Sequence, residues 1–250
     1  MNANLKYASV ASETGPLLAE YLEDRGVELT PKSSNVLCYG LPSNSRFNLN
    51  GLVGGGNKIK RLVQMKQGNV RTVPWFQGTD VPEGFQFPAL ARQISGHGGL
   101  DIVPVFQREE VPWRVKAGWS WFSSVVPVLT EYRVWIYRGT CLDVYEKVMI
   151  RPEDYKYVGR NFRNGFDFQL VTDYDSTPVM ASISEAIKCV RSLSFDFGAV
   201  DLLVTPAHVA FVLECNTAPG VVKSGAQVTL GKLADHMVEW LKAGCPERGY

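Results

Sequence analysis

The stretch that decides the fold reads Asp201-Leu202-Leu203-Val204-Thr205-Pro206-Ala207-His208-Val209-Ala210-Phe211-Val212-Leu213-Glu214-Cys215-Asn216. Two apolar runs flank a short segment that contains Pro206, and this pattern predicts a β-hairpin. If residues 205–208 form the turn, Val204 faces Val209 across the hairpin. Each strand then carries a carboxylate near the open end of the hairpin.

Counting outward from that turn places Asp201 opposite Val212. Because successive side chains in a strand point to alternate faces, Glu214 becomes the diagonal neighbour of Asp201 on the same face, and Asn216 follows there. Diagonal neighbours lie roughly 7–8 Å apart, so one cation could lie between their oxygen atoms. The count depends on the turn length, since one residue more or less would break this arrangement.

Oxygen atoms from Asp201, Glu214 and Asn216 are hard ligands of the kind that suits Mg²⁺, which also keeps waters and substrate phosphates. A carboxylate that is buried without a partner costs free energy, so a buried pair favours a bound cation. The simpler alternative is that both carboxylates lie exposed at the ends of their strands.

The same region resembles the metal-binding end of the ATP-grasp ligases. This superfamily includes glutathione synthetase, D-alanine–D-alanine ligase and the ligases that add glutamate to a ribosomal protein, and small stand-alone members of this kind resemble those of bacteria and phages. The resemblance rests on Phe197-Gly198-Ala199-Val200-Asp201, followed by Val212-Leu213-Glu214-Cys215-Asn216-Thr217-Ala218-Pro219-Gly220. It implies that Asp201, Glu214 and Asn216 bind Mg²⁺, for which Mn²⁺ can substitute, and that ATP is a substrate.

A glycine-rich stretch, Ser95-Gly96-His97-Gly98-Gly99, resembles the loop that closes over ATP in this superfamily. Glycines let backbone amides approach phosphate closely, so Gly96, His97, Gly98 and Gly99 are candidate nucleotide-binding residues. The superfamily usually has a lysine just before the loop, where this chain has Arg92. Arginine can bind phosphate oxygens through two N–H groups, although the change leaves the phosphate geometry open. A plain turn and a solvated Arg92 are the alternatives.

Two segments supply further basic residues, Glu131-Tyr132-Arg133-Val134 and Tyr145-Glu146-Lys147. Strand alternation puts Glu131 and Arg133 on one face. The resemblance implies that Arg133 and Lys147 contact the β- and γ-phosphates or an acyl phosphate. The alternative for each is a surface ion pair with Glu131 or Glu146.

The remaining nucleotide and phosphate contacts rest on looser matches. Val125 and Val126 fall where the superfamily holds adenine, and Lys58 falls where it often carries another nucleotide-facing lysine. Arg160 begins the basic loop Arg160-Asn161-Phe162-Arg163-Asn164-Gly165 and is a candidate for contact with phosphate or with an acidic substrate. A solvated loop is the alternative.

The strand that carries Glu214 and Asn216 is joined to a predicted last helix by the segment Thr217-Ala218-Pro219-Gly220-Val221-Val222-Lys223-Ser224. The unpaired amides and partial positive charge at a helix N-terminus can hold a substrate carboxylate. Gly220, Lys223 and Ser224 are therefore candidate substrate-binding residues. The alternative is that Ser224 only caps the helix, as its spacing to Gln227 suggests.

Apolar periodicity and turn residues predict the other elements. They indicate helices at 12–25 and at 182–193, and two more that begin at Asn57 and near Ser224. The helix that begins at Asn57 would carry Ile59, Leu62 and Val63 on one side. The same patterns indicate strands at 36–39, 125–128, 132–137, 142–148, 199–204 and 209–213. Helices segregated from mainly antiparallel strands predict an α+β fold. The resemblance implies the ATP-grasp fold, with a reduced N-terminal α/β segment (1–57) and two subdomains (58–130 and 131–250) that grip ATP.

Composition excludes several classes of function. The chain has 250 residues and a net charge of +1, which gives no overall field for nucleic acid or an anionic membrane. Five scattered cysteines form no CxxC pair, which predicts reduced thiols in a cytoplasm, that of a host cell if the chain is phage-encoded. The N-terminus lacks a signal-peptide pattern. No GxxxxGK[ST] or Gly-x-Ser-x-Gly motif is present, and Asp196-Phe197-Gly198 lacks the other kinase motifs.

The resemblance implies a reaction in two steps. A substrate carboxylate attacks the γ-phosphate of ATP to give an acyl phosphate and ADP, and an amine then displaces phosphate. The substrates would be a small-molecule or peptide carboxylate and amine, without nucleic acid or membrane. Two alternatives remain open, an ATP-grasp phosphotransferase that uses no amine and a degenerate module that binds nucleotide without turnover.

Overall fold

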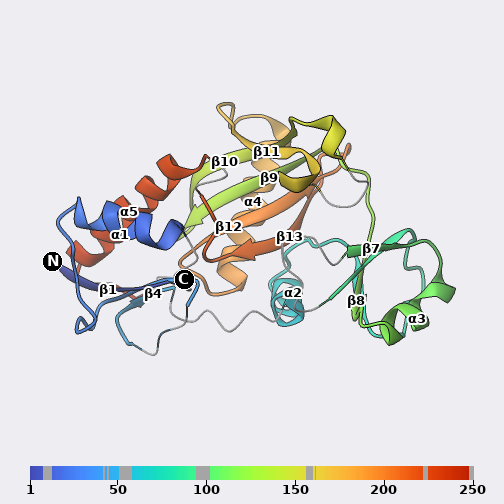
Figure 1. Ribbon diagram of the computed structural model, residues 1–250, viewed down its shortest axis with the longest axis horizontal. Helices are drawn as coiled ribbons and strands as arrows, with labels where there is room; N and C mark the ends of the chain where they lie inside the picture. Colours follow the sequence, from blue (N-terminus) through green and yellow to red (C-terminus); the bar gives the residue numbers. More distant parts are fainter. Residues whose placement is uncertain are drawn as a thin grey trace.

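The computed structural model describes residues 1–7, 13–41, 43, 45–50, 58–93, 102–155, 160, 162–221 and 225–247. Within these residues, three β-sheets follow one another along the long axis of the molecule, and helices cover them (Figure 1). None of the described helices is long and apolar enough to cross a membrane.

The first sheet is parallel and has the strand order β2-β1-β3-β4. Its strands are β1 (Asn2–Tyr7), β2 (Glu28–Leu29), β3 (Val36–Tyr39) and β4 (Asn48–Leu49). Helix α1 (Thr14–Glu23) connects β1 to β2 and ends before Gly26, whose φ of 77° suits glycine. The predicted helix at 12–25 and strand at 36–39 are thus present, whereas β1 was not predicted.

The last helix of the chain, α5 (Gln227–Lys242), packs beside α1 at the same end of the molecule (Figure 1). Arg25, just after α1, donates from Nε to Asp235 on α5 at 2.5 Å. The apolar face of α5 is buried, and Leu233, Met237 and Trp240 join one core cluster with residues of β1, β3 and α1. The first sheet therefore shares its core with the other end of the chain.

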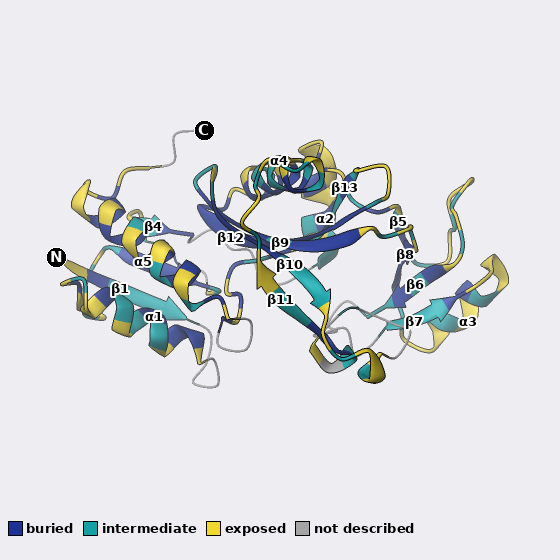
Figure 2. Ribbon diagram, turned by 90° about the horizontal axis from the view of Figure 1, so that it is seen from above, coloured by how far each residue is buried: buried dark blue, intermediate teal, exposed yellow. Residues whose placement is uncertain are grey.

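The central sheet is antiparallel, with the order β11-β10-β9-β12-β13. Its strands are β9 (Thr130–Tyr137), β10 (Thr140–Met149), β11 (Phe166–Leu170), β12 (Phe197–Val204) and β13 (Ala210–Asn216), and the short helices η2 (Pro152–Asp154) and η3 (Phe162–Asn164) lie between β10 and β11. Figure 2 shows β9 and β12 buried along most of their length, with α4 (Thr177–Ser192) across one face.

Strand alternation divides the central sheet into two faces. Val134 on β9 and Val200 on β12 point toward α4 and belong to its core cluster. Trp135 and Ala199 point the other way and belong to the cluster that contains α5. The same face continues along β9 and β12 with charged side chains, beginning with Arg133 and Asp201, which are paired in register.

The third sheet is antiparallel and small, with the order β5-β8-β6-β7. It contains β5 (Trp75–Gln77), β6 (Ala89–Arg92), β7 (Ile102–Val105) and β8 (Trp121–Ser124), and it follows α2 (Lys58–Gln67). Helices η1 (Arg108–Glu110) and α3 (Val111–Lys116) lie between β7 and β8. Its own core includes Phe76 and Phe122, whose rings stack at 4.8 Å.

Two predicted element boundaries and one predicted helix face are wrong. The strand predicted at 125–128 lies at Trp121–Ser124 instead, because Pro127 has no amide hydrogen for a sheet and the chain leaves the small sheet there. The helix predicted at 182–193 begins at Thr177, where Pro178 stands in its first turn. On α2 the buried residues are Leu62 and Met65, whereas Val63 is exposed.

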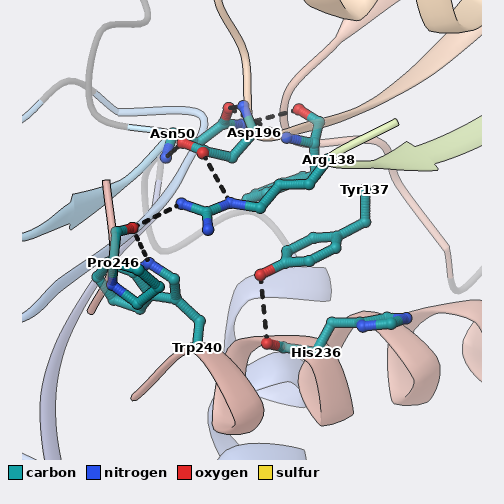
Figure 3. A network of polar contacts seen from close by, with 8 residues as sticks. Asn50, Tyr137, Arg138, Asp196, His236, Trp240 and Pro246 are labelled. Carbon is teal, nitrogen blue, oxygen red and sulfur yellow. Dashed lines mark hydrogen bonds and ion pairs between the residues drawn. The ribbon is translucent and has the colours of Figure 1, made fainter. Parts of the chain in front are cut away.

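A buried polar network ties the first sheet to the central one (Figure 3). Asn50, which follows β4 with a φ of 62°, donates from Nδ2 to the carbonyl of Phe197 at 3.0 Å and accepts from the amide of Asp196 at 2.9 Å. Asp196 accepts from the Asn50 amide at 2.7 Å and from Arg138 at 3.1 Å. Asp196 therefore has a structural role just before β12. This role agrees with the interpretation that Asp196-Phe197-Gly198 is not a kinase motif.

Candidate active site

The hairpin β12–β13 has a longer turn than predicted. Val204 pairs with Ala210, not with Val209, and Thr205 donates its amide to the Val209 carbonyl at 3.0 Å. The intervening three residues end with His208 at a φ of 58°, which is the left-handed residue typical of three-residue hairpin loops. Without compensation, this extra residue would have broken the predicted arrangement of the carboxylates.

A β-bulge restores the arrangement. The register shifts between Asp201 and Leu202, so that Leu202 pairs with Val212 while Asp201 pairs directly with Glu214. The extra residue on the bulged strand is Leu213. Asp201 and Glu214 are therefore direct cross-strand neighbours and not the predicted diagonal ones, which brings their Cβ atoms to about 4.5–5.5 Å instead of about 7–8 Å.

Asp201 is buried and held by Arg133 from the neighbouring strand β9. Arg133 donates from Nε and Nη2 to the two carboxylate oxygens of Asp201 at 2.6 and 2.8 Å. Burial alone would raise the pKa of Asp201, but the Arg133 guanidinium outweighs it and lowers the pKa below its ordinary value. The same carboxylate, against the effect of burial, raises the pKa of Arg133.

Glu214 and Asn216 complete the predicted ligand set at the end of β13. Glu214 is exposed, and it accepts a hydrogen bond of 3.2 Å from Nδ2 of Asn216. This contact uses the amide nitrogen of Asn216, so the amide oxygen can serve as a ligand for a cation. Within the described part of the chain, no three His, Cys, Asp or Glu side chains gather around one point. Two carboxylates and an amide oxygen fit Mg²⁺, because each carboxylate oxygen held by Arg133 keeps a second lone pair.

Lys147 and Arg160 gather around a second buried carboxylate, Glu131. Lys147 on β10 donates to Glu131 at 2.8 Å, and Nε of Arg160 lies 3.6 Å from the other carboxylate oxygen. Glu131 and Lys147 expose only 11 and 12% of their side chains, so the pair lies within the sheet face and is no solvated surface pair. The structure therefore brings all three predicted catalytic cations to the charged half of one face.

Arg92 adds a fourth cation from the small sheet. Its Nε donates to Oγ of Ser123 at 3.3 Å, and its Cζ lies 5.1 Å from the centre of the Trp121 ring. Burial lowers the pKa of Arg92, whereas Glu214 and Glu131 act in the opposite direction, which places Arg92 within electrostatic reach of the central face. The neighbouring Trp121 Nε1 is a buried donor without a partner among the described residues. The small sheet thus offers polar atoms to a bound group.

The other predicted nucleotide and substrate residues have different outcomes. Val125 is exposed and Val126 half-buried in the link that follows β8. Lys58 is the first residue of α2, and one turn later Arg61 donates to the Cys215 carbonyl of β13 at 3.0 Å. Gly220 is exposed, directly after Pro219. The residues of the glycine-rich loop, Gly96, His97, Gly98 and Gly99, and those of the substrate loop, Lys223 and Ser224, lie outside the described residues.

The predicted cap of the last helix is wrong. Helix α5 begins at Gln227, and its N-cap position is Ala226, which makes no side-chain cap. The segment 217–221 is instead held by the first sheet and by α1: Oη of Tyr39 on β3 donates to the Pro219 carbonyl at 2.5 Å, and Val221 donates its amide to Oγ1 of Thr14 on α1 at 3.2 Å. No local pattern at Tyr39 or Thr14 could have indicated these contacts, because they join residues far apart in the sequence.

The aromatic strand beside the cations was not predicted from the sequence. Phe166 and Phe168 on β11 lie on one face, opposite Met149 and Lys147 of β10. The Phe168 ring centre lies 4.4 Å from Cζ of Arg133 and 5.6 Å from Nζ of Lys147. Alternating aromatic residues in this strand were the available signal, but their partners depend on the sheet order.

No protein-family model matches the chain. A D-alanine–D-alanine ligase from Clostridium botulinum (strain Eklund 17B / Type B) is 24% identical in an alignment of 204 residues, and the match covers 70% of this chain and 64% of that ligase. The chain therefore spans less than two thirds of the length of this curated relative.

Several solved structures are similar over nearly the whole chain. D-alanine–D-alanine ligase from Bacillus anthracis has a TM-score of 0.69 at 15% identity, with 98% of each chain covered. ATP-grasp ligase PsnB, complexed with a phosphomimetic variant of its minimal precursor, Mg and ADP, has a TM-score of 0.66 at 11% identity. That comparison covers 95% of this chain and 97% of PsnB. At these identities the likeness concerns the fold.

Proposed function

We propose, starting from the ATP-grasp fold of this chain, that it is an ATP- and magnesium-dependent ligase that joins a carboxylate to an amine through an acyl phosphate. The observation that carries the proposal is the direct pairing of Asp201 with Glu214 on a face that also presents Arg133 and Lys147. Such a face combines oxygen ligands for a cation with donors for phosphate oxygens, which phosphoryl transfer requires.

The basic side chains would bind and orient the phosphates. Arg133 and Lys147 lie on the central face, Arg160 beside them and Arg92 on the small sheet. In the proposed reaction these cations would surround the place where charge develops on the transferred group. A Mg²⁺ ion held by Asp201, Glu214 and Asn216 would neutralise negative charge on the phosphate oxygens. The rest of ATP would be bound by Val125, Val126, Lys58 and the residues of the glycine-rich loop, Gly96, His97, Gly98 and Gly99.

The segment 217–224 would hold the second substrate. It leaves β13 at Asn216 and is held at Pro219 by Tyr39 of the first sheet and at Val221 by Thr14 of α1, so it would run from the proposed cation site toward α5. Gly220, Lys223 and Ser224 are the proposed contacts. The amine would displace phosphate directly from the acyl phosphate, so no protein nucleophile is needed. We also propose that the protein works in a cytoplasm, where ATP is available.

The test measures ADP release by the purified chain with ATP, Mg²⁺ and a panel of amino acids and peptides as carboxylate and amine. We expect Glu214→Gln and Asp201→Asn each to reduce turnover by orders of magnitude, because each removes a charged oxygen ligand. A matched control is Glu239→Gln, which changes an exposed carboxylate on α5. Near-normal turnover of Glu214→Gln at limiting Mg²⁺ would remove Glu214 from the site.

The same assay separates the two alternatives. A phosphotransferase would release ADP with the carboxylate or another acceptor alone, without dependence on an amine. A degenerate module would bind ATP and release no ADP with any pair of substrates. A requirement for both a carboxylate and an amine supports the ligase.

A further inference from the structure

The edge strand β11 places two phenylalanine rings under the three cations of the central face. Phe168 lies beneath Arg133 and Lys147, and the Phe166 ring centre lies 5.6 Å from Cζ of Arg160. All of these distances are within the roughly 6 Å range of a cation–π contact. One short strand therefore contacts Arg133 and Lys147 of the central sheet as well as Arg160 from the connection between β10 and β11.

Each of these cations also faces a carboxylate. Arg133 is paired with Asp201, and Lys147 and Arg160 with Glu131. A carboxylate attracts the N–H groups that a phosphate would need, so it competes with a phosphate ligand for the cation. A neutral ring attracts a cation through its quadrupole and takes none of its N–H donors as a conventional acceptor would. The ring contact can persist while a phosphate replaces the carboxylate.

We propose that Phe168 is a positioning residue of this site, whose ring holds Arg133 and Lys147 in place for the phosphates of a bound nucleotide. The proposal deepens the proposed function and rests on it, since it requires nucleotide at this face. Phe168 is favoured over Phe166 because it contacts two cations and pairs with Lys147 in the sheet register. It is half-buried and packs against the main core cluster, so its ring has a fixed support.

The test measures the dissociation constant of ADP with Mg²⁺ by calorimetry, without any second substrate. Phe168 is replaced by phenylalanine with one, two and three ring fluorines, which weaken the quadrupole while the shape of the ring stays nearly constant. We expect the dissociation constant to rise stepwise with each fluorine, by about threefold to tenfold for the trifluoro ring. Phe168→Leu should cause a similar loss, and Phe168→Tyr, which keeps a ring face, should bind ADP within about twofold of the unmodified chain.

The matched control is Phe47, whose ring centre lies 5.8 Å from Cζ of Arg46, a pair outside the proposed site. Fluorination there should leave ADP binding unchanged. Melting temperatures of the fluorinated chains should agree with that of the unmodified chain, since apolar volume is kept.

The outcomes distinguish a failure of the proposed function from a failure of the role assigned to Phe168. If the unmodified chain binds no ADP, the proposed function is overturned and this inference with it. If the unmodified chain binds ADP and the fluorine series at Phe168 shows no trend, the role of Phe168 alone is overturned. A trend that is equally strong at Phe47 also overturns it, because the effect would then be unrelated to the site.

Discussion

Arg133 and Asp201 form a buried ion pair between neighbouring strands, with side chains only 15 and 10% exposed. The desolvation of two charges generally offsets much of the attraction between them, so a pair of this kind is weak support for stability by itself. An apolar pair would fill the same space at no electrostatic cost. The presence of charges here therefore agrees better with a role in the proposed site than with a role in packing.

The first prediction concerns the loss of one partner from the Arg133–Asp201 ion pair. Arg133→Met should lower the free energy of unfolding by about 3–5 kcal/mol, because it leaves a buried carboxylate without its partner. The double variant Arg133→Met with Asp201→Leu should recover most of this loss. Urea unfolding monitored by fluorescence measures the free energy of unfolding of both variants. A double variant as unstable as the single one would show that packing, and not charge, sets the cost.

The second prediction concerns pH. Burial works to raise the pKa of Asp201, but Arg133 outweighs it, so the folded pKa lies below the unfolded value of about 3.9. Stability from this group is therefore complete above about pH 4 and is lost as the pH falls through the folded pKa. The difference in unfolding free energy between the unmodified chain and Asp201→Asn should shrink below about pH 4. A constant difference down to pH 2.5 would contradict it.

At the scale of elements, α5 is fixed to the central sheet by a buried polar cluster. Thr229 in its first turn donates to Asp143 of β10 at 2.7 Å and shares a hydrogen bond of 2.6 Å with the Tyr145 hydroxyl. Lys232, one turn later, donates to Asp143 at 2.6 Å. This cluster sets the position at which α5 begins, and with it the far end of the segment proposed to bind substrate.

The third prediction is that Thr229→Val lowers the free energy of unfolding by about 1–3 kcal/mol. Valine keeps the shape but removes the hydroxyl, so Asp143 and Tyr145 each lose a buried partner. The matched control is Thr140→Val, an exposed position on β10, which should change stability by less than about 0.5 kcal/mol. Equal effects of the two variants would contradict a role for the cluster.

The hairpin shows how far sequence predicts an element. The alternation of apolar and polar residues correctly predicted two strands with Asp201 and Glu214 on a shared face. The turn was predicted one residue too short and the bulge at Leu213 was not predicted, and these two errors cancelled. A bulge depends on how both strands pack in the sheet, so local periodicity does not reveal it.

At the scale of the molecule, Asn50 joins segments that are distant in sequence. Its side chain accepts a hydrogen bond from the amide of Asp196, the residue before β12. Asp196 also accepts a hydrogen bond from Arg138, which donates to the Pro246 carbonyl at 3.0 Å (Figure 3). The network thus links the first sheet, the central sheet and the residues after α5. Such long-range contacts, like those of Phe168, could not be predicted from spacing, because they depend on the assembled sheet order.

The fourth prediction tests this link. Asn50→Gly keeps the positive φ but removes three buried side-chain hydrogen bonds, so it should lower the free energy of unfolding by about 1–3 kcal/mol. Asn69→Gly is the matched control, since Asn69 has a φ of 54° and is exposed, and it should be nearly neutral. Hydrogen exchange should also rise in β3 of Asn50→Gly. Unchanged exchange would show that the first sheet does not depend on this network.

The sharing of one core by α1 and α5 also bears on the synthesis of the protein. Leu18 and Leu22 of α1 lie in one buried core cluster with Leu233 and Met237 of α5, which a ribosome adds much later. Until α5 emerges, the nascent first sheet and α1 expose apolar surface that has no partner. Such surface is a site for premature association or for chaperone binding. Completion of the core around the first sheet and α1 therefore waits for α5.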